Sequence, residues 1–253
     1  MGSSTKIIGM VAIVVTFIAL SVSHIMSIVS PTASSGLSEE EVRDIVKDYI
    51  AQNPQEIMAS IENHFNQQKQ IKAAEAQNAI KNDWDKIANN PKDPIVGNPD
   101  GDVTVVEFFD YSCGYCRKVL PSIAQLLDVD KNVKVVFKEL PILGQRSNMA
   151  SMAALAVHDI APEKYWDFHK ALFEGRITTQ TAILDKASKL GIDKEKLSQA
   201  LKSPSIQDTI NNNQLLARRL GINGTPAFII NGELIPGAVG FETLLEEVNK
   251  ARK

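Results

Sequence analysis

The sequence predicts an α/β fold in which a block of helices interrupts the strands. Short segments with the branched and aromatic composition typical of strands occur at residues 103–109, 133–140, 227–231 and 233–236. Helical periodicity fills residues 148–220, between the second and third of these segments. Asn231-Gly232, between the last two, is a preferred pair for a tight hairpin turn.

The first 29 residues form a separate apolar segment. Lys6 is the only charge near the start, and a nearly unbroken apolar run follows from Ile7 to Leu20 and continues weakly to Val29. This pattern is typical of a secretory signal peptide, and its length also approaches the ~20 residues of a membrane-spanning helix. Cleavage would release a soluble protein, and retention would leave an N-terminal anchor. Both readings export the rest of the chain, because Lys6 stays in the cytoplasm.

A polar linker at residues 30–36 leads into a helical arm over residues 37–90. Ser38 is a candidate N-cap, and three glutamates follow it in the first turn. Apolar residues at helical spacing reach Ile50, Asn53-Pro54 breaks the pattern, and a second helical stretch runs to about residue 88. Its apolar stripe is narrow, so the arm packs either on the following domain or on the same arm of another subunit. We expect self-association.

The main domain is expected over residues 95–253, after a boundary rich in Pro, Gly and Asn. The first strand turns directly into a helix from Arg117 to Leu127, and Pro141 closes the second strand. Breaks at Ala161-Pro162, Gly175, Gly191 and Ser203-Pro204 divide the helical block into several helices. A final helix is expected from Phe241 to Lys250.

Composition narrows the function classes. The 253 residues include 44 % hydrophobic and 23 % charged residues with a net charge of −3, which is ordinary for a globular protein. The charges are interspersed, so nucleic acid is not an expected partner. The chain has no Gly-rich phosphate loop, and we expect no cofactor.

The two cysteines, Cys113 and Cys116, stand three residues apart where a strand turns into a helix. A structural disulfide closing so short a loop gains little loop entropy. Redox exchange, in contrast, benefits from this position, because the positive end of the helix dipole stabilises a thiolate on Cys113. Cys116 lies one turn further on the same face, within reach to resolve a mixed disulfide.

Zinc binding is a weaker alternative, since a structural site needs about four ligands and one Cys-x-x-Cys supplies two. The four histidines show no paired ligand spacing, and we expect them on helix surfaces: His24, His64, His158 and His169. Arg117 and Lys118 either support the thiolate or are ordinary solvated charges.

Two motifs carry a resemblance to a known family. The segment from Glu107 to Cys116, Glu-Phe-Phe-Asp-Tyr-Ser-Cys-Gly-Tyr-Cys, resembles the active-site segment of DsbA-like proteins of the thioredoxin superfamily, and Gly224-Thr225-Pro226 resembles their cis-proline loop. The resemblance covers about residues 95–253 and implies a thioredoxin fold with an inserted helical subdomain. The arm resembles the oligomerisation segment of ScsC-type members, which implies a homodimer or homotrimer.

The resemblance also implies roles for individual residues. Cys113 would be the exposed nucleophile and Cys116 the buried resolving cysteine. Pro226 would be the cis-proline, and Thr225 would present backbone groups to a substrate strand. Glu107 would be the buried carboxylate that moves the proton of the resolving thiol. The ordinary alternatives are a strand-start proline at position 226 and a solvent-facing residue at position 107.

The function implied is that of a protein thiol–disulfide oxidoreductase in the periplasm, soluble or tethered to the inner membrane. Its partners would be exported proteins with free thiols or wrong disulfides and a DsbB-like or DsbD-like membrane redox protein. Gly114-Tyr115 stands where the strongest oxidants of the family carry Pro-His, and the neutral Tyr115 adds no positive charge. The potential should therefore be less oxidising, which keeps an isomerase or reductase open beside an oxidase. A holdase with a merely structural disulfide is a competing class, against which the short cysteine spacing argues.

Overall fold

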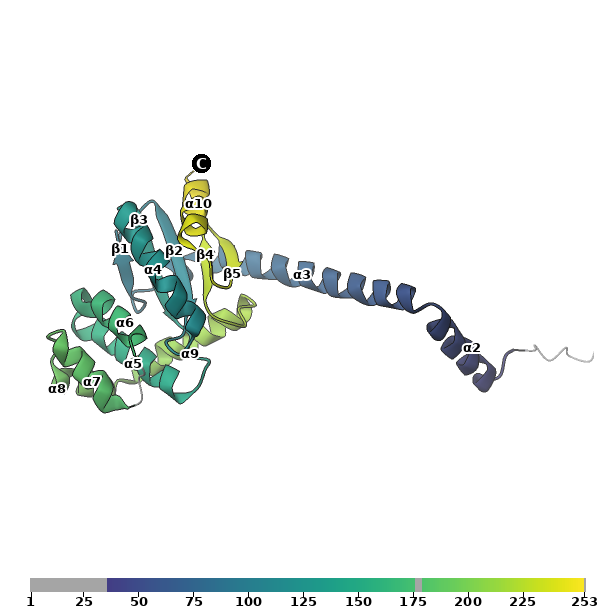
Figure 1. Cartoon of the computed structure of the whole chain (residues 1–253), viewed down its shortest axis with the longest axis horizontal. Coiled ribbons are helices and arrows are strands. Elements are labelled where there is room, and N and C mark those ends of the chain that lie inside the picture. The colour runs from purple at the N-terminus through teal and green to yellow at the C-terminus, as the bar shows by residue number, and fades with distance from the viewer. Residues whose placement is uncertain (1–35, 176–178, 253) are drawn as a thin grey trace, which may run out of the picture. The chain divides into compact units, whose positions relative to one another are not determined.

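The computed structural model describes residues 36–175 and 179–252, and the apolar segment at residues 1–29 lies outside them. The chain divides into two units, the first ending at His64 and the second beginning at Phe65. Two helices come first, α2 (Glu39–Gln52) and α3 (Pro54–Ala88), with the break between them at Asn53 as expected (Figure 1). No helix in residues 36–175 and 179–252 is long and apolar enough to span a membrane.

Helix α2 begins with a reciprocal capping box. The Ser38 hydroxyl accepts a hydrogen bond from the Glu41 backbone N–H at 3.3 Å, and the Glu41 carboxylate accepts one from the Ser38 N–H at 2.8 Å. None of the residues of α2 is buried, although its apolar residues recur on one face. The helix therefore forms through its own local interactions and leaves an apolar stripe uncovered in the described chain.

The second unit is built on a five-stranded sheet of order β1-β3-β2-β4-β5. The strands are β1 (Ile95–Gly97), β2 (Val103–Phe109), β3 (Val133–Glu139), β4 (Ala227–Ile230) and β5 (Glu233–Pro236). Strands β2 and β3 run parallel, and the other neighbours are antiparallel. The expected hairpin joins β4 and β5, with positive φ at Asn231 and Gly232. Strand β1 was not predicted, because its three residues lie within the Pro- and Gly-rich boundary.

The helices after β2 largely match the predicted order. They are α4 (Gly114–Val129), α5 (Gln145–Ile160), the short 3-10 helix η1 (Pro162–Lys164), α6 (Tyr165–Phe173), α7 (Gln180–Lys189), α8 (Lys194–Ala200), α9 (Pro204–Arg219) and α10 (Phe241–Ala251). Figure 1 shows α4 in front of the strands, and α5 to α8 form a separate helical group beside them. The inserted block is thus confirmed.

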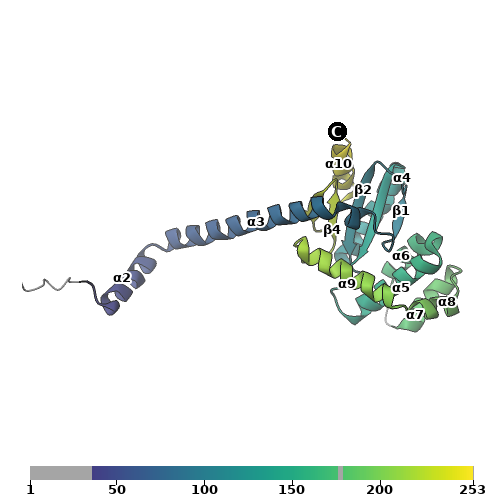
Figure 2. The ribbon, with the colours of Figure 1, turned by 180° about the vertical axis from the view of Figure 1, so that it is seen from behind.

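Each face of the sheet has its own apolar cluster. Val105 and Phe109 of β2 join residues of α4, α10 and the helical block on one face. Val106 and Phe108 point to the other face and pack with residues of α9 and of the end of α3. Figure 2, seen from behind, shows these two helices on that side of the sheet. Ile80 and Ile87 of α3 are fully buried there. This last part of α3 therefore packs on the following domain, the alternative to self-association.

A buried ion pair fastens this second face. Lys138 of β3 and Asp93 are both fully buried and pair directly, and Lys138 also donates to the Lys86 carbonyl at 3.1 Å. Asn213 of α9 donates to Asp93 at 3.3 Å. Because an unpaired buried charge is costly, these contacts require β3, α9 and the end of α3 to remain together.

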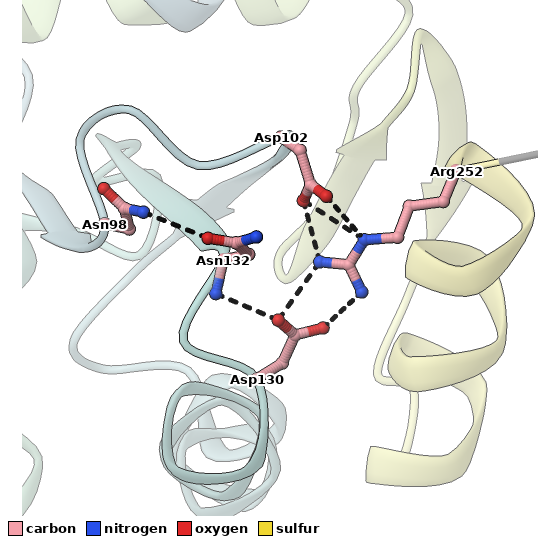
Figure 3. Close-up of polar contacts among 5 residues, drawn as sticks. All are labelled: Asn98, Asp102, Asp130, Asn132 and Arg252. Atoms are coloured by element: carbon pink, nitrogen blue, oxygen red, sulfur yellow. Dashed lines mark hydrogen bonds and ion pairs between the residues drawn. The ribbon is translucent and has the colours of Figure 1, made fainter.

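A second polar cluster ties the C-terminal helix to the start of β2 (Figure 3). Arg252 donates to Asp102 through Nε and Nη2, and to Asp130 at 2.6 Å through Nη1. Hydrogen bonds with Arg252 hold the pKa of both carboxyls below their usual range, and those with Asp130 and Asp102 raise the pKa of Arg252. The cluster lies at the opposite end of β2 from the cysteines.

Candidate active site

Cys113 lies at the junction between β2 and α4. It is the N-cap of α4, in extended conformation, and its N–H donates to the Asp110 carbonyl at 3.0 Å. No side chain caps the helix start, so the first N–H groups of α4 remain available to a charged sulfur. Cys113 is 7 % exposed, so it is more deeply buried than the exposed nucleophile that the resemblance implied.

The predicted cis-proline loop meets this sulfur. The Thr225–Pro226 peptide bond is cis, and the Cys113 Sγ donates to the Thr225 carbonyl at 3.2 Å across 112 residues of sequence. The Pro226 carbonyl accepts from the Gly237 N–H at 2.9 Å, which fixes the loop to the end of β5. The structure thus brings together the two motifs that sequence analysis singled out.

Cys116 is the more deeply buried thiol. It is 1 % exposed, and both cysteines are free thiols in this structure. Burial raises the pKa of the Cys116 thiol well above its usual range, and the nearby Glu107 carboxylate raises it further. The two sulfurs therefore differ in kind, because Cys116 resists becoming an anion.

Glu107 lies in the middle of β2 and faces the cysteine side of the sheet. It is 2 % exposed, which excludes the solvent-facing alternative. Its cross-strand neighbours are Phe137 and Phe228, which offer it no charge. Burial, and secondarily the negative charge of Cys113, raises the pKa of Glu107 to about 8. Its carboxyl group is thus protonated near neutral pH and lies within electrostatic reach of both sulfurs.

Comparisons with known proteins agree with this geometry. Residues 104–249 match the DSBA-like thioredoxin domain, which is more than half of the chain. The chain belongs to the DsbA-like thioredoxin-domain family. The thioredoxin fold with an inserted helical subdomain is therefore confirmed, and the protein is a thiol–disulfide oxidoreductase.

Three relatives illustrate the similarity. The chain is 42 % identical to a thioredoxin-like oxidoreductase from Silicibacter pomeroyi, with a TM-score of 0.63 over 66 % of this chain and 96 % of that one. It is 30 % identical to Proteus mirabilis ScsC, with a TM-score of 0.65 over 84 % of this chain and 96 % of that one. It is 27 % identical to disulfide bond formation protein D of Bacillus subtilis, over 67 % of this chain and 82 % of the relative.

Asp110 is a residue of this DsbA-like site that sequence analysis missed. It is fully buried, and one carboxylate oxygen accepts from the Ser112 N–H at 2.7 Å. The other accepts from the N–H groups of Ile142 and Leu143 at 2.8 and 2.9 Å. The carboxylate therefore fixes both the turn before Cys113 and the loop after β3. An aspartate in a turn, bonding the N–H two residues on, is the signal that could have shown it.

A buried polar cluster under the turn was also missed. Tyr111 contacts His169 Nδ1 at 2.9 Å and donates to Glu139 at 3.3 Å, and Tyr165 contacts the same ring nitrogen at 3.3 Å. The expectation of a surface position for His169 is wrong, because aromatic rings enclose it completely. Burial lowers the pKa of His169 to about 3, so its ring is neutral near pH 7, and burial raises the pKa of Glu139 well above its usual range.

Within residues 36–175 and 179–252, no three His, Cys, Asp or Glu side chains gather in an arrangement that could hold an ion.

Replacing Glu107 should change how stability depends on pH. Because its pKa is raised from 4.5 to about 8, the stability contributed by the protonated group is fully present below pH 4.5 and lost as pH rises through 8. The free energy of unfolding of the wild type, minus that of Glu107→Gln, should fall between pH 5 and 8 by up to ~1.4 kcal/mol per pH unit. Urea denaturation of the reduced proteins measures it. Glu242→Gln, at an exposed carboxyl on α10, is the control. A difference independent of pH would contradict the assignment.

Proposed function

We propose that this protein forms, and also isomerises, disulfide bonds in exported proteins through a reversible mixed disulfide at Cys113. A second client thiolate resolves it when a bond is formed, and Cys116 resolves it in the reverse direction. The observation that carries the proposal is the contact between the Cys113 sulfur and the Thr225 carbonyl beside a cis-proline. A substrate strand that pairs with this loop is directed toward the Cys113 sulfur and away from the buried Cys116.

The exchange balances with the groups present. In the oxidised protein, a substrate thiolate attacks the Cys113 sulfur, and the bond to Cys116 breaks with Cys116 leaving as a thiolate. A second substrate thiolate then attacks the substrate sulfur of the mixed disulfide and releases Cys113. The substrate loses two electrons and two protons, and the protein ends as a dithiol.

Glu107 has a role in the first of these steps. The leaving Cys116 sulfur is buried and disfavours negative charge, so it needs a proton as the bond breaks. Glu107 holds a proton near neutral pH and can supply it, then regain one from solvent. In the reverse direction, the same group accepts the proton of Cys116.

A second candidate is an isomerase or reductase that is kept as a dithiol. Tyr115 favours it, since its phenol side chain, which is 63 % exposed, adds no positive charge beside the cysteines. Equilibration with glutathione buffers separates the two functions. A midpoint potential near about −120 mV marks a strong oxidant, and one near about −270 mV marks a reductant.

The surroundings of the reaction follow from the N-terminal pattern. An exported chain acts in the periplasm, either released by cleavage or tethered by residues 1–29. Continued turnover needs a membrane redox partner, DsbB-like to reoxidise the dithiol or DsbD-like to keep it reduced.

We also propose that the arm, residues 37–90, makes the protein a homodimer or homotrimer. In α2 the apolar residues of one face are 45–54 % exposed: Val42, Ile45, Val46, Tyr49 and Ile50. Such a stripe at helical spacing is the form that pairs with a second helix. Similarity to ScsC extends over 84 % of the chain, further than the catalytic domain alone, and supports the proposal.

Trapping tests the roles of the two cysteines. With Cys116→Ser, the Cys113 thiolate attacks a disulfide-bonded client protein and displaces one client sulfur as a thiolate. No internal thiol remains to resolve the mixed disulfide, so adducts should accumulate on non-reducing gels. With Cys113→Ser, adducts should be absent and exchange should slow by about 100-fold or more, because the remaining sulfur is buried. Adducts on Cys116 in the Cys113→Ser variant would contradict the assignment.

Cross-linking of the full chain tests self-association. The double variant Ile45→Gln, Ile50→Gln should lose the cross-linked dimer or trimer band, because it removes apolar area while keeping good helix formers. Arg43→Gln, Lys47→Gln changes the polar side of the same helix and should keep the band. A wild type that yields only monomer, or a band unaffected by the first variant, would overturn the proposal.

A further inference from the structure

A small hollow lies directly beside the active-site turn. It encloses about 170 Å³, and its wall includes Ser112 next to the reactive cysteine, Arg117 of α4, Arg146 of α5 and Leu172 of α6. The active-site helix and the helical block thus contribute to it together. A hollow needs only ~10–15 Å³ of such volume to hold one water molecule, so this one has room for a side-chain carboxylate.

Two guanidinium groups line this hollow, and neither has a partner in the described chain. Arg117 and Arg146 are exposed, and neither side chain forms an ion pair or a hydrogen bond with another described residue. Asp110, the buried acidic residue nearest to Arg117 in sequence, accepts hydrogen bonds only from backbone N–H groups and from neither arginine. The positive charge at the hollow is therefore available to a ligand.

The placement of these arginines opposes helix stability. Both lie in the first turn of their helix, where the dipole favours acidic residues and disfavours cations. Neither α4 nor α5 has an acidic residue in that turn, whereas α2 has three. The N-cap of α5, Gly144, also provides no side-chain hydrogen bond. The starts of α4 and α5 and the two arginines therefore give the hollow a positive potential. This potential favours a bound anion, whereas the two cations do not stabilise the helices.

We propose that this hollow binds the carboxylate of an aspartate or glutamate that lies a few residues from the reacting cysteine of a client polypeptide. A guanidinium group matches a carboxylate with two parallel hydrogen bonds. Because Ser112 is next to Cys113, a client strand held at Thr225 can place a neighbouring side chain there. The site would select acidic clients. This inference rests on the proposed function.

The test measures how fast peptide thiols reduce the Cys113–Cys116 disulfide of the full chain. Two peptides are used, each with one cysteine and differing only by Glu or Gln two residues from it. The ratio of their rate constants in one protein, compared between proteins, cancels the effect of Glu on the peptide thiol itself. The neutral thiol 2-mercaptoethanol gives the basal rate.

In the Arg146→Gln variant, the rate constant with the Glu peptide divided by that with the Gln peptide should fall about threefold to tenfold. The rate with 2-mercaptoethanol should stay as in the wild type. Arg146→Lys should restore part of the ratio. Lys131→Gln removes the same charge beyond the far end of α4 and should leave the ratio unchanged. Salt at 0.5 M should reduce the wild-type ratio to that of Arg146→Gln.

A ratio equal in the wild type and Arg146→Gln would overturn this inference. So would an equal fall in Lys131→Gln, which would show only a general effect of net charge. Failure of the proposed function would differ from both, because the wild type would then also fail to react with 2-mercaptoethanol.

Discussion

The contact between the Cys113 sulfur and the Thr225 carbonyl depends on the pairing of β2 with β4. Phe108 of β2 pairs with Ala227 of β4. The chain that leaves β2 and the chain that enters β4 therefore meet at the same end of the sheet. Both connections are short, and each carries one of the two motifs. The position of the Cys113 sulfur against the cis-proline loop is therefore a consequence of sheet order.

The surroundings of each buried group then decide its chemistry, for the two carboxyl groups and for the two sulfurs of this segment. Asp110 and Glu107 are both buried carboxyls, but Asp110 accepts three backbone N–H bonds while Glu107 is surrounded by apolar strand neighbours. The three hydrogen bonds let the first fix the turn, whereas burial raises the pKa of the second to about 8 so that it keeps a proton near neutral pH. The same logic distinguishes the sulfurs, since Cys113 sits at an open helix start and Cys116 one turn further inside.

The features that could be predicted from the sequence are those that depend on a local pattern of residues. The strands, the helical block, the hairpin at Asn231 and the cysteine pair at a helix start follow from periodicity and turn chemistry over a few residues. His169 was misplaced because its partners, Tyr111 and Glu139, come from distant segments whose meeting no local pattern encodes. Arg146 and Arg117 likewise share a hollow only because the helical block folds back beside α4.

The proposed exchange depends on the two sulfurs being unequal, and thiol-specific alkylation tests this most directly. The reduced full chain is exposed to iodoacetamide from pH 5 to 10, and modification at each cysteine is followed by mass spectrometry. Cys113 should be alkylated faster than Cys116 at every pH, while Cys116 stays unmodified in the folded protein because burial opposes its ionisation. Equal rates at both cysteines, or faster modification of Cys116, would contradict the account.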